Sequence, residues 1–497
     1  PRATWVSNSA TDPCVPMIPA MRVARKPDSA HGTEPCDRRK PWALRATALA
    51  AAVLVSACTS FGVIDNKPLL GGEDRPGYTL ETFNRTLNQR SDELSLAVAF
   101  SGGGTRAAAL AYGVMQELRD TRVRLQGTER SLLEAVNVIS SVSGGSFTSA
   151  YYGLYGNRLF EDFEARFLRR NIEGALLRSL FNPLQWFSSH DRTETAVSYY
   201  KENLFGEATF RDLIRKNAPL ILINTSDLAS GERFTFSQEY FDLLCSDLNS
   251  FSLARAVTAS SAVPVVFDPV VVENYSGCSR RPPAWLTAAR QRDANNPNLA
   301  MVVRDNETYN DKVRHRYAQF VDGGITDNLG LRAMLDTIEL VGGARQFQKD
   351  MNIQVPQRIA FISVNAAADT PLGIGATSRA PSIENTLNAV TNIQLHRYNV
   401  ATLQQTQQSV EAWARQLSTP QRPVTPYFIR LSFDSMPDGP LRRFLNEIPT
   451  SFTLSAEQVD QLIATGRELL RTHPDYQRLV ASLAGMVGAA TPATPAR

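Results

Sequence analysis

The chain has 497 residues, of which 43% are hydrophobic and 20% are charged, a composition typical of a globular protein and unlike that of a disordered chain or a coiled coil. Eight of its 52 basic residues, but only four of its 49 acidic residues, lie within residues 1–57. The remaining body therefore carries 44 basic and 45 acidic side chains. This balance excludes a nucleic-acid-binding protein, which needs a concentrated basic surface.

The first predicted element is an apolar run at residues 46–57, which read ATALAAAVLVSA after a basic stretch. As a helix, these twelve residues would span about 18 Å, which is too short for a bilayer core of about 30 Å. The run is therefore interpreted as the core of a signal peptide, and we expect residues 1–57 to be removed. The part before Met17 or Met21 has no targeting character and is interpreted as an over-extended start.

The stretch Leu54 to Cys58 (LVSAC) resembles a bacterial lipobox. That resemblance implies cleavage before Cys58, lipidation of Cys58, and a lipid anchor in the cell envelope. Residue 59 is Thr and not the Asp that retains such proteins in the inner membrane, so the outer membrane is favoured. The alternative is an ordinary secretory signal with an incidental Cys. The polar, turn-rich residues 58–93 are predicted to be a tether.

Two strand–loop–helix units follow, which predict an α/β fold. The first has a strand at 94–100 and a helix at 105–120, and the second has a strand at 135–141 and a helix at 146–155. Further strands are predicted at 219–224, 319–321, 358–364 and 427–432. Because these strands are almost continuously apolar, we expect a mainly parallel central sheet covered by helices on both faces.

The domain organisation follows from changes in composition. Residues 94–366 are predicted to be the main domain, with a polar inserted excursion at about 273–316. Helices are predicted at 383–417 and 455–472, so residues 367–483 are interpreted as a mostly helical C-terminal extension. Residues 484–497 are predicted to be a disordered tail.

The first motif is the glycine loop Gly102-Gly103-Gly104 between the first strand and its helix. Glycines let neighbouring backbone N–H groups converge, and the helix N-terminus favours negative charge, so the loop is suited to hold an anion. With Ala107, it also matches the weak dinucleotide pattern G-x-G-x-x-A. That function requires an acidic residue at the end of the second strand, where this chain has Ser-Ser-Val-Ser-Gly-Gly. The dinucleotide alternative is therefore disfavoured.

The second motif is Ser143, on the sharp turn after the second strand. This is the context of a nucleophile elbow, in which the N–H of the next residue, Gly144, can donate to an oxyanion. The pattern departs from G-x-S-x-G, because Ser141 stands in place of the first Gly, although Gly145 is present. A structural Ser/Gly-rich loop is the alternative.

The third motif is Asp322-Gly323-Gly324, directly after a short apolar run. An Asp at a strand end is well placed to face a cleft, whereas a turn-forming Asp-Gly is the structural alternative.

In this order, the three motifs resemble the patatin-like phospholipase family. Three further segments support the resemblance, namely Asp191 to Phe205, Ile223 to Ser237 and Ala254 to Val270. The resemblance covers roughly residues 94–366 and makes this region the expected catalytic domain, although the stretch 273–316 is longer than the family usually has.

The resemblance implies a serine acyl hydrolase for lipid carboxyl esters, with Ser143 as nucleophile and Asp322 as base in a Ser–Asp dyad. It implies neither a cofactor nor a metal. The expected oxyanion hole comprises Gly102, Gly103, Gly104 and Gly144, and the expected supporting residues are Arg106, Gly145, Gly323 and Gly324. For Arg106, an ion pair that holds the glycine loop is preferred over binding of a lipid phosphate.

Several alternatives stay open. His315 is the one histidine near a motif that could replace the base, but it lies in the charged segment DKVRHRY. Asp227 is interpreted as structural. Cys245 and Cys278 are candidates for a disulfide, and their spacing from histidines does not fit a zinc site. A catalytically silent envelope lipoprotein that uses the same fold for binding or scaffolding is the second functional hypothesis.

Overall fold

The computed structural model describes residues 62–484 except 70–76, 88–91, 173, 175–191, 265, 279–281, 369–377 and 379. The predicted signal segment, Cys58 and residues 485–497 lie outside the described residues.

The core of the fold is an eight-stranded sheet with the strand order β12-β11-β2-β5-β6-β10-β9, with β7 added beside β6. Its strands are β2 (Leu94–Phe100), β5 (Val136–Val142), β6 (Leu220–Asp227), β7 (Arg233–Thr235), β9 (Val270–Glu273), β10 (Tyr317–Asp322), β11 (Arg358–Asn365) and β12 (Thr425–Ser432). The run from β12 to β6 is parallel, whereas β10, β9 and β7 are antiparallel to their neighbours. The prediction of a mainly parallel α/β sheet is confirmed.

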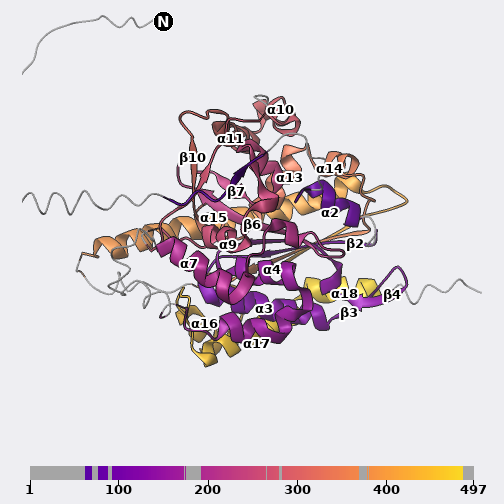
Figure 1. The fold of residues 1–497 in the computed structure, drawn as a ribbon. Coiled ribbons are helices and arrows are strands. Elements are labelled where there is room, and N and C mark those ends of the chain that lie inside the picture. The colour runs from indigo at the N-terminus through magenta and orange to yellow at the C-terminus, as the bar shows by residue number, and fades with distance from the viewer. Residues whose placement is uncertain are drawn as a thin grey trace, which may run out of the picture. The chain divides into compact units, whose positions relative to one another are not determined.

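Helices cover both faces of this sheet (Figure 1). On one face lie α3 (Gly104–Asp120), α17 (Ala456–Thr472) and α18 (Pro474–Ala484), and on the other lie α2 (Leu80–Leu87), α13 (Arg332–Leu340), α14 (Ala344–Asp350) and α15 (Ile383–Leu417). The other α-helices of the described residues are α4 (Gly144–Tyr155), α5 (Leu159–Phe163), α7 (Arg192–Tyr200), α8 (Gln238–Leu243), α9 (Leu253–Ser260), α10 (Ala284–Arg290), α11 (Pro297–Glu307), α12 (Gly324–Asp327) and α16 (Pro440–Glu447). Every residue of β6 is buried, which explains its unbroken apolar start.

One hairpin of short strands was not predicted. The hairpin of β3 (Arg122–Leu125) and β4 (Thr128–Ser131) turns at Gln126 and Gly127, which both have positive φ. This geometry is typical of a tight hairpin turn. Because its strands contain several charged residues, apolar runs in the sequence do not predict it.

The predicted insertion at 273–316 is the connection between the antiparallel neighbours β9 and β10. It contains α10 and α11, and the latter is capped by Asn296, whose side chain accepts a hydrogen bond from the N–H of Leu299. The polar excursion is therefore a folded helical unit at the sheet edge. Cys278 of this stretch forms a disulfide with Cys245, with Cα atoms 5.5 Å apart.

The predicted tether at 58–93 needs correction, because its described part packs against the body. Tyr78 is fully buried, and its hydroxyl donates to the carbonyl of Ile221 (2.8 Å) and accepts from the N–H of the same residue (2.9 Å). Strand β1 (Lys67–Pro68) pairs with β8 (Ser246–Asp247). Single buried residues among polar turn residues leave no periodic signal, so the sequence pattern misses this packing.

The C-terminal residues belong to the same compact unit as the main domain. Strand β12 forms an edge of the central sheet, and α17 packs on α3 at very short range. A Cβ on Gly113 of α3 would lie 2.2 Å from the carbonyl oxygen of Ile463, and one on Gly466 of α17 would lie 2.4 Å from that of Leu110. Glycine at both positions lets the two backbones touch.

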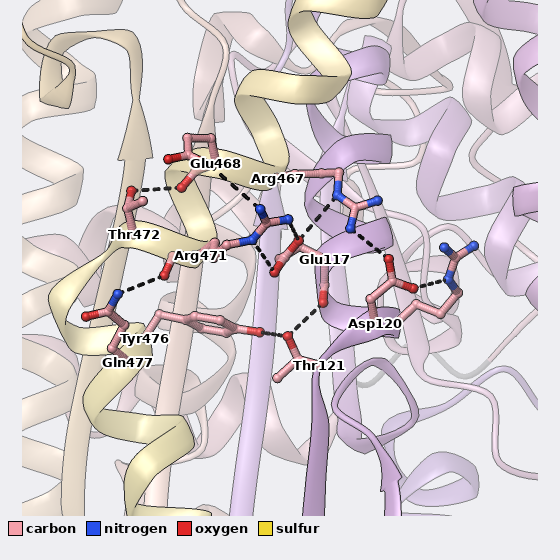
Figure 2. Close-up of polar contacts among 10 residues, drawn as sticks. Glu117, Asp120, Thr121, Arg467, Glu468, Arg471, Thr472, Tyr476 and Gln477 are labelled. Carbon is pink, nitrogen blue, oxygen red and sulfur yellow. Dashed lines mark hydrogen bonds and ion pairs between the residues drawn. The ribbon is translucent and has the colours of Figure 1, made fainter.

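Charged residues extend this helix contact toward its C-terminal end (Figure 2). Arg471 donates two hydrogen bonds to the carboxylate of Glu117, at 3.0 and 2.7 Å. Arg467 contacts Glu117 at 3.3 Å and donates to Asp120 at 2.8 Å. The residues predicted as an extension thus fix the helix that begins at the glycine loop.

Candidate active site

Ser143 occupies a strained turn between β5 and α4, with φ 49° and ψ −122°. This region is sparsely populated for residues other than glycine, and such strain is typical of nucleophile elbows. The two following glycines are required sterically. A Cβ on Gly144 would lie 1.9 Å from the carbonyl oxygen of Gly104, and one on Gly145 would lie 2.7 Å from Cβ of Phe100.

Asp322 reaches Ser143 across strand β6. Val142 pairs with Asn224 on one side of β6, and Asp322 pairs with Thr225 on the other. The register therefore brings the two side chains over the same part of the sheet. The Ser143 hydroxyl donates a hydrogen bond of 2.8 Å to Oδ2 of Asp322.

Burial raises the pKa of the Asp322 carboxyl to about 6. Two hydrogen bonds act in the opposite direction, one from the N–H of Gly324 to Oδ1 (2.7 Å) and one from Ser143. The carboxylate is therefore a stronger base than a solvated one, and among the described residues no histidine hydrogen-bonds to Ser143 or to the Asp322 carboxylate. His315 precedes β10, whose other end carries Asp322, so it lies away from this site.

The glycine loop lies against the elbow, as the close approach of Gly104 and Gly144 shows. Gly103 and Gly104 have φ values of 135° and 60°, which favour glycine. Within the described residues, the N–H groups of Gly103, Gly104 and Gly144 have no hydrogen-bond acceptor. These three donors are available to a substrate oxygen at the start of two helices.

Gly102 differs from the expectation. Its N–H donates to the carbonyl of Asn328 at 2.9 Å, so it is not available to an oxyanion, and its predicted place in the oxyanion hole is wrong. A Cβ on Gly102 would lie 2.7 Å from Oδ1 of Asn328 and 3.3 Å from Cβ of Ser143. Gly102 therefore permits the close packing that brings the loop next to the nucleophile.

Comparison with known proteins gives a family for the central part of the chain. The family model described as patatin-like phospholipase matches residues 98–335. Residues 98–335 are a patatin-like phospholipase domain. The domain belongs to a family of lipid acyl hydrolases, and it contains Ser143, Asp322 and the glycine loop.

Solved structures to which this chain is similar include human GIVD cytosolic phospholipase A2, at 12% identity and a TM-score of 0.44, over 82% of this chain and 67% of that one. The same human enzyme in complex with methyl gamma-linolenyl fluorophosphonate gives 11% identity and a TM-score of 0.37, over 81% of this chain and 62% of that one. The chain thus spans about two thirds of the length of these structures. No curated protein sequence matches it.

Two residues of the patatin-like domain that hold the site were missed by the sequence analysis. The Ser260 hydroxyl accepts from the N–H of Ser143 (2.9 Å) and donates to the carbonyl of Asn224 (2.6 Å), so it fixes the elbow. Asn328 anchors the glycine loop, as described above. Ser260 lies in one of the segments that support the family resemblance, which is the one signal that could have indicated it.

Gly323 and Gly324 shape the turn that follows Asp322. A Cβ on Gly323 would lie 2.4 Å from the carbonyl oxygen of Asn224, and the N–H of Gly324 binds the Asp322 carboxylate. Asp227 accepts hydrogen bonds from Tyr309 (3.0 Å) and from the N–H of Gln319 (2.9 Å), contacts that fit the structural role expected for it.

Arg106 was expected to form an ion pair that holds the glycine loop. In the described part of the chain it forms no ion pair, so this expectation is wrong. Its guanidinium donates to the carbonyls of Ala366 and Ile448 and to the hydroxyl of Thr450, which are all neutral. Burial lowers the pKa of Arg106 to about 10.

Across the described residues, no cluster of three or more His, Cys, Asp or Glu side chains is arranged to hold a metal ion. Among the helices of the same residues, none combines the length and the apolar character needed to span a membrane.

Proposed function

We propose that this protein is a serine hydrolase that cleaves carboxyl esters of lipids through the dyad of Ser143 and Asp322. The observation that carries the proposal is the 2.8 Å hydrogen bond between Ser143 Oγ and Asp322 Oδ2 inside a patatin-like phospholipase domain. The raised pKa of Asp322 supports its assignment as the base.

In the proposed reaction, Asp322 accepts the hydroxyl proton as Ser143 Oγ attacks the ester carbonyl carbon. The N–H groups of Gly103, Gly104 and Gly144 stabilise the resulting oxyanion. Collapse of this intermediate breaks the ester bond, and the leaving alcohol takes the proton from Asp322. A water molecule then gives a proton to Asp322 as its oxygen attacks the acyl carbonyl carbon. When this second intermediate collapses, the bond to Ser143 Oγ breaks, Oγ takes the proton back from Asp322, and the fatty acid leaves.

The lipobox-like sequence supports a further part of the proposal, namely a lipid anchor on Cys58 at the outer membrane. An anchor would keep the enzyme at the surface where its substrates are concentrated. Incorporation of a fatty-acid label into the wild type, but not into Cys58→Ser, is the expected result. Equal labelling of both would contradict the anchor.

The dyad is tested with residues 59–497 on a nitrophenyl butyrate ester and on phospholipid vesicles, comparing wild type with Ser143→Ala and Asp322→Asn. We expect both variants to fold and to lose at least about 10³-fold in kcat. An alkyl fluorophosphonate should label the wild type and leave Ser143→Ala unlabelled. Activity that survives both substitutions would overturn the assignment of the dyad.

A folded wild type that is inert on every ester would favour the silent lipoprotein instead. The sequence feature behind that alternative was Ser141 in place of the first elbow glycine. Ser141 is fully buried, and its hydroxyl lies 2.6 Å from that of Ser149. Since the elbow accommodates this serine, the departure from the pattern does not argue against catalysis.

A further inference from the structure

The segment Ile448–Phe452, which follows α16 and lies beyond the patatin-like domain, packs directly on the glycine loop. The N–H of Thr105 donates to the carbonyl oxygen of Ser451 at 2.9 Å. A Cβ on Gly104 would lie 2.6 Å from the same oxygen. The missing side chain of Gly104 therefore lets this distant segment touch the loop backbone. Glycine also suits the positive φ of this residue.

Arg106 ties the same segment to the loop from a second direction. Its Nε donates to the carbonyl of Ala366 (2.8 Å), Nη2 donates to the hydroxyl of Thr450 (3.0 Å), and Nη1 donates to the carbonyl of Ile448. The side chain is 5% exposed. All three nitrogens of the guanidinium donate to oxygen atoms of the protein. We therefore do not expect the guanidinium to bind a substrate phosphate.

The other end of the segment contacts two aromatic side chains near the chain segments that lead to Ser143 and Asp322. The ring of Phe452 contacts that of Phe147, in the helix that starts after Ser143, with centroids 6.4 Å apart. It also contacts Phe267 at 6.0 Å. Phe267 is five residues beyond Ala262, whose carbonyl accepts the N–H of Asp322 at 2.8 Å.

We propose that Ile448–Phe452 completes the active site and that Arg106 is a positioning residue, which holds the N–H groups of Gly103 and Gly104 toward the oxyanion through this segment. The inference rests on the proposed hydrolase function. Oxyanion donors act because they are fixed before the reaction. A displacement of about 1 Å in such a group can cost about 100-fold in rate.

The test compares Arg106→Lys with a matched control, Arg358→Lys. Arg358 also ties the C-terminal region to the sheet, because it donates to the hydroxyl and the carbonyl of Ser482 at 2.8 Å each. It lies at the opposite end of β11 from Ala366. Thr450→Val is a milder second variant that removes one acceptor of Arg106 and keeps the side-chain volume.

On nitrophenyl butyrate, which has no phosphate, we expect Arg106→Lys to lower kcat by about 10- to 100-fold with little change in KM. Thr450→Val should lower kcat in the same direction by a smaller factor, and Arg358→Lys should leave kcat unchanged even if its Tm falls. Amide hydrogen exchange of residues 101–105 should accelerate in Arg106→Lys and not in Arg358→Lys.

Three outcomes would overturn the inference. An unchanged kcat on the butyrate ester with a raised KM for phospholipid would make Arg106 a phosphate ligand. Parallel losses of kcat in Arg106→Lys and Arg358→Lys would reduce its role to general stability. Unchanged hydrogen exchange at 101–105 would show that the loop is held by other contacts. A wild type inert on all esters would instead defeat the hydrolase proposal, and the exchange measurement would still test the positioning.

Discussion

Ser143, the proposed nucleophile, has a backbone conformation that costs free energy. A non-glycine residue in such a region is destabilised by about 1–3 kcal/mol, and its φ of 49° persists because the surrounding sheet and helix fix it. Ser143→Gly and Ser143→Ala both remove the hydroxyl, but only glycine relieves the strain. We expect both to be inactive and Ser143→Gly to be more stable than Ser143→Ala by about 1 kcal/mol in urea unfolding, after the entropy cost of glycine. Equal stabilities would contradict strain at this residue.

The buried carboxyl of Asp322 determines how activity depends on pH. Burial raises its pKa to about 6, and the ionised form is the proposed base. We therefore expect kcat/KM on a soluble ester to fall as the pH decreases through about 6, with a limiting slope of one. An ordinary carboxyl, with a pKa near 3.9, would leave the rate flat down to about pH 5, and a flat profile in that range would contradict this assignment.

The same shift predicts that Asp322→Asn stabilises the fold. As the pH rises from 4 to 6, the unfolded chain loses this proton before the folded chain does, so the native state loses stability relative to the unfolded state. Asn does not titrate, and its amide can still bond to Ser143 and Gly324. We expect the variant to gain up to about 3 kcal/mol in free energy of unfolding above pH 6, with the gain vanishing below pH 4. A loss of stability at pH 8 would contradict this prediction.

At the scale of elements, the contact of α3 with α17 depends on glycine. Gly466→Ala places a methyl group about 2.4 Å from the carbonyl oxygen of Leu110, and such overpacking costs about 1–3 kcal/mol. Gly277→Ala is a suitable control, because a Cβ there meets no atom within 4 Å. Thermal unfolding should show a clear drop in Tm for Gly466→Ala and almost none for the control. Similar Tm values for the two variants would show that the helices separate at little cost.

Local sequence patterns predicted several strands and helices and the turn at Ser143. The contacts between distant segments depend on strand pairing, which these patterns do not predict. The strand at 94–100 and the helix at 383–417 have the predicted bounds, because an apolar run and a long helical stretch are visible in the sequence itself. The elbow at Ser143 was likewise readable from its Ser-Gly-Gly turn. The bond between Ser143 and Asp322 depends on the antiparallel pairing of β10 with β6, which no local pattern encodes.

The neutral partners of Arg106 show the same limit, because all of them come from residues 366–450. A single sequence indicates that a buried arginine needs acceptors, but it does not indicate which segment provides them. The expectation of an ion pair was wrong for this reason. Two of the acceptors are backbone carbonyls, and every residue has one, so the sequence does not mark them.

At the scale of the whole molecule, the folded unit is longer than the part that matches the family model. The match covers residues 98–335, whereas the C-terminal residues belong to the same compact unit. Strand β12 pairs with β11 along eight residues, from Arg358↔Thr425 to Asn365↔Ser432. A chain ending at residue 366 would expose that strand edge, which promotes aggregation, and would leave the α17 side of α3 uncovered. We expect it to be aggregated or rapidly degraded in limited proteolysis, whereas a chain ending at residue 484 should behave as the full chain does. A stable, monomeric product ending at 366 would contradict this account.

The contact of Ile448–Phe452 with the glycine loop also has a consequence for the order of events in the cell. Ser143 and Asp322 leave the ribosome long before the segment that completes their site. Under the proposed mechanism, the enzyme stays inert while its chain is being synthesised, and it becomes competent only when the C-terminal residues have folded back onto the domain. The late arrival of these residues would protect the membranes of the producing cell from an immature enzyme.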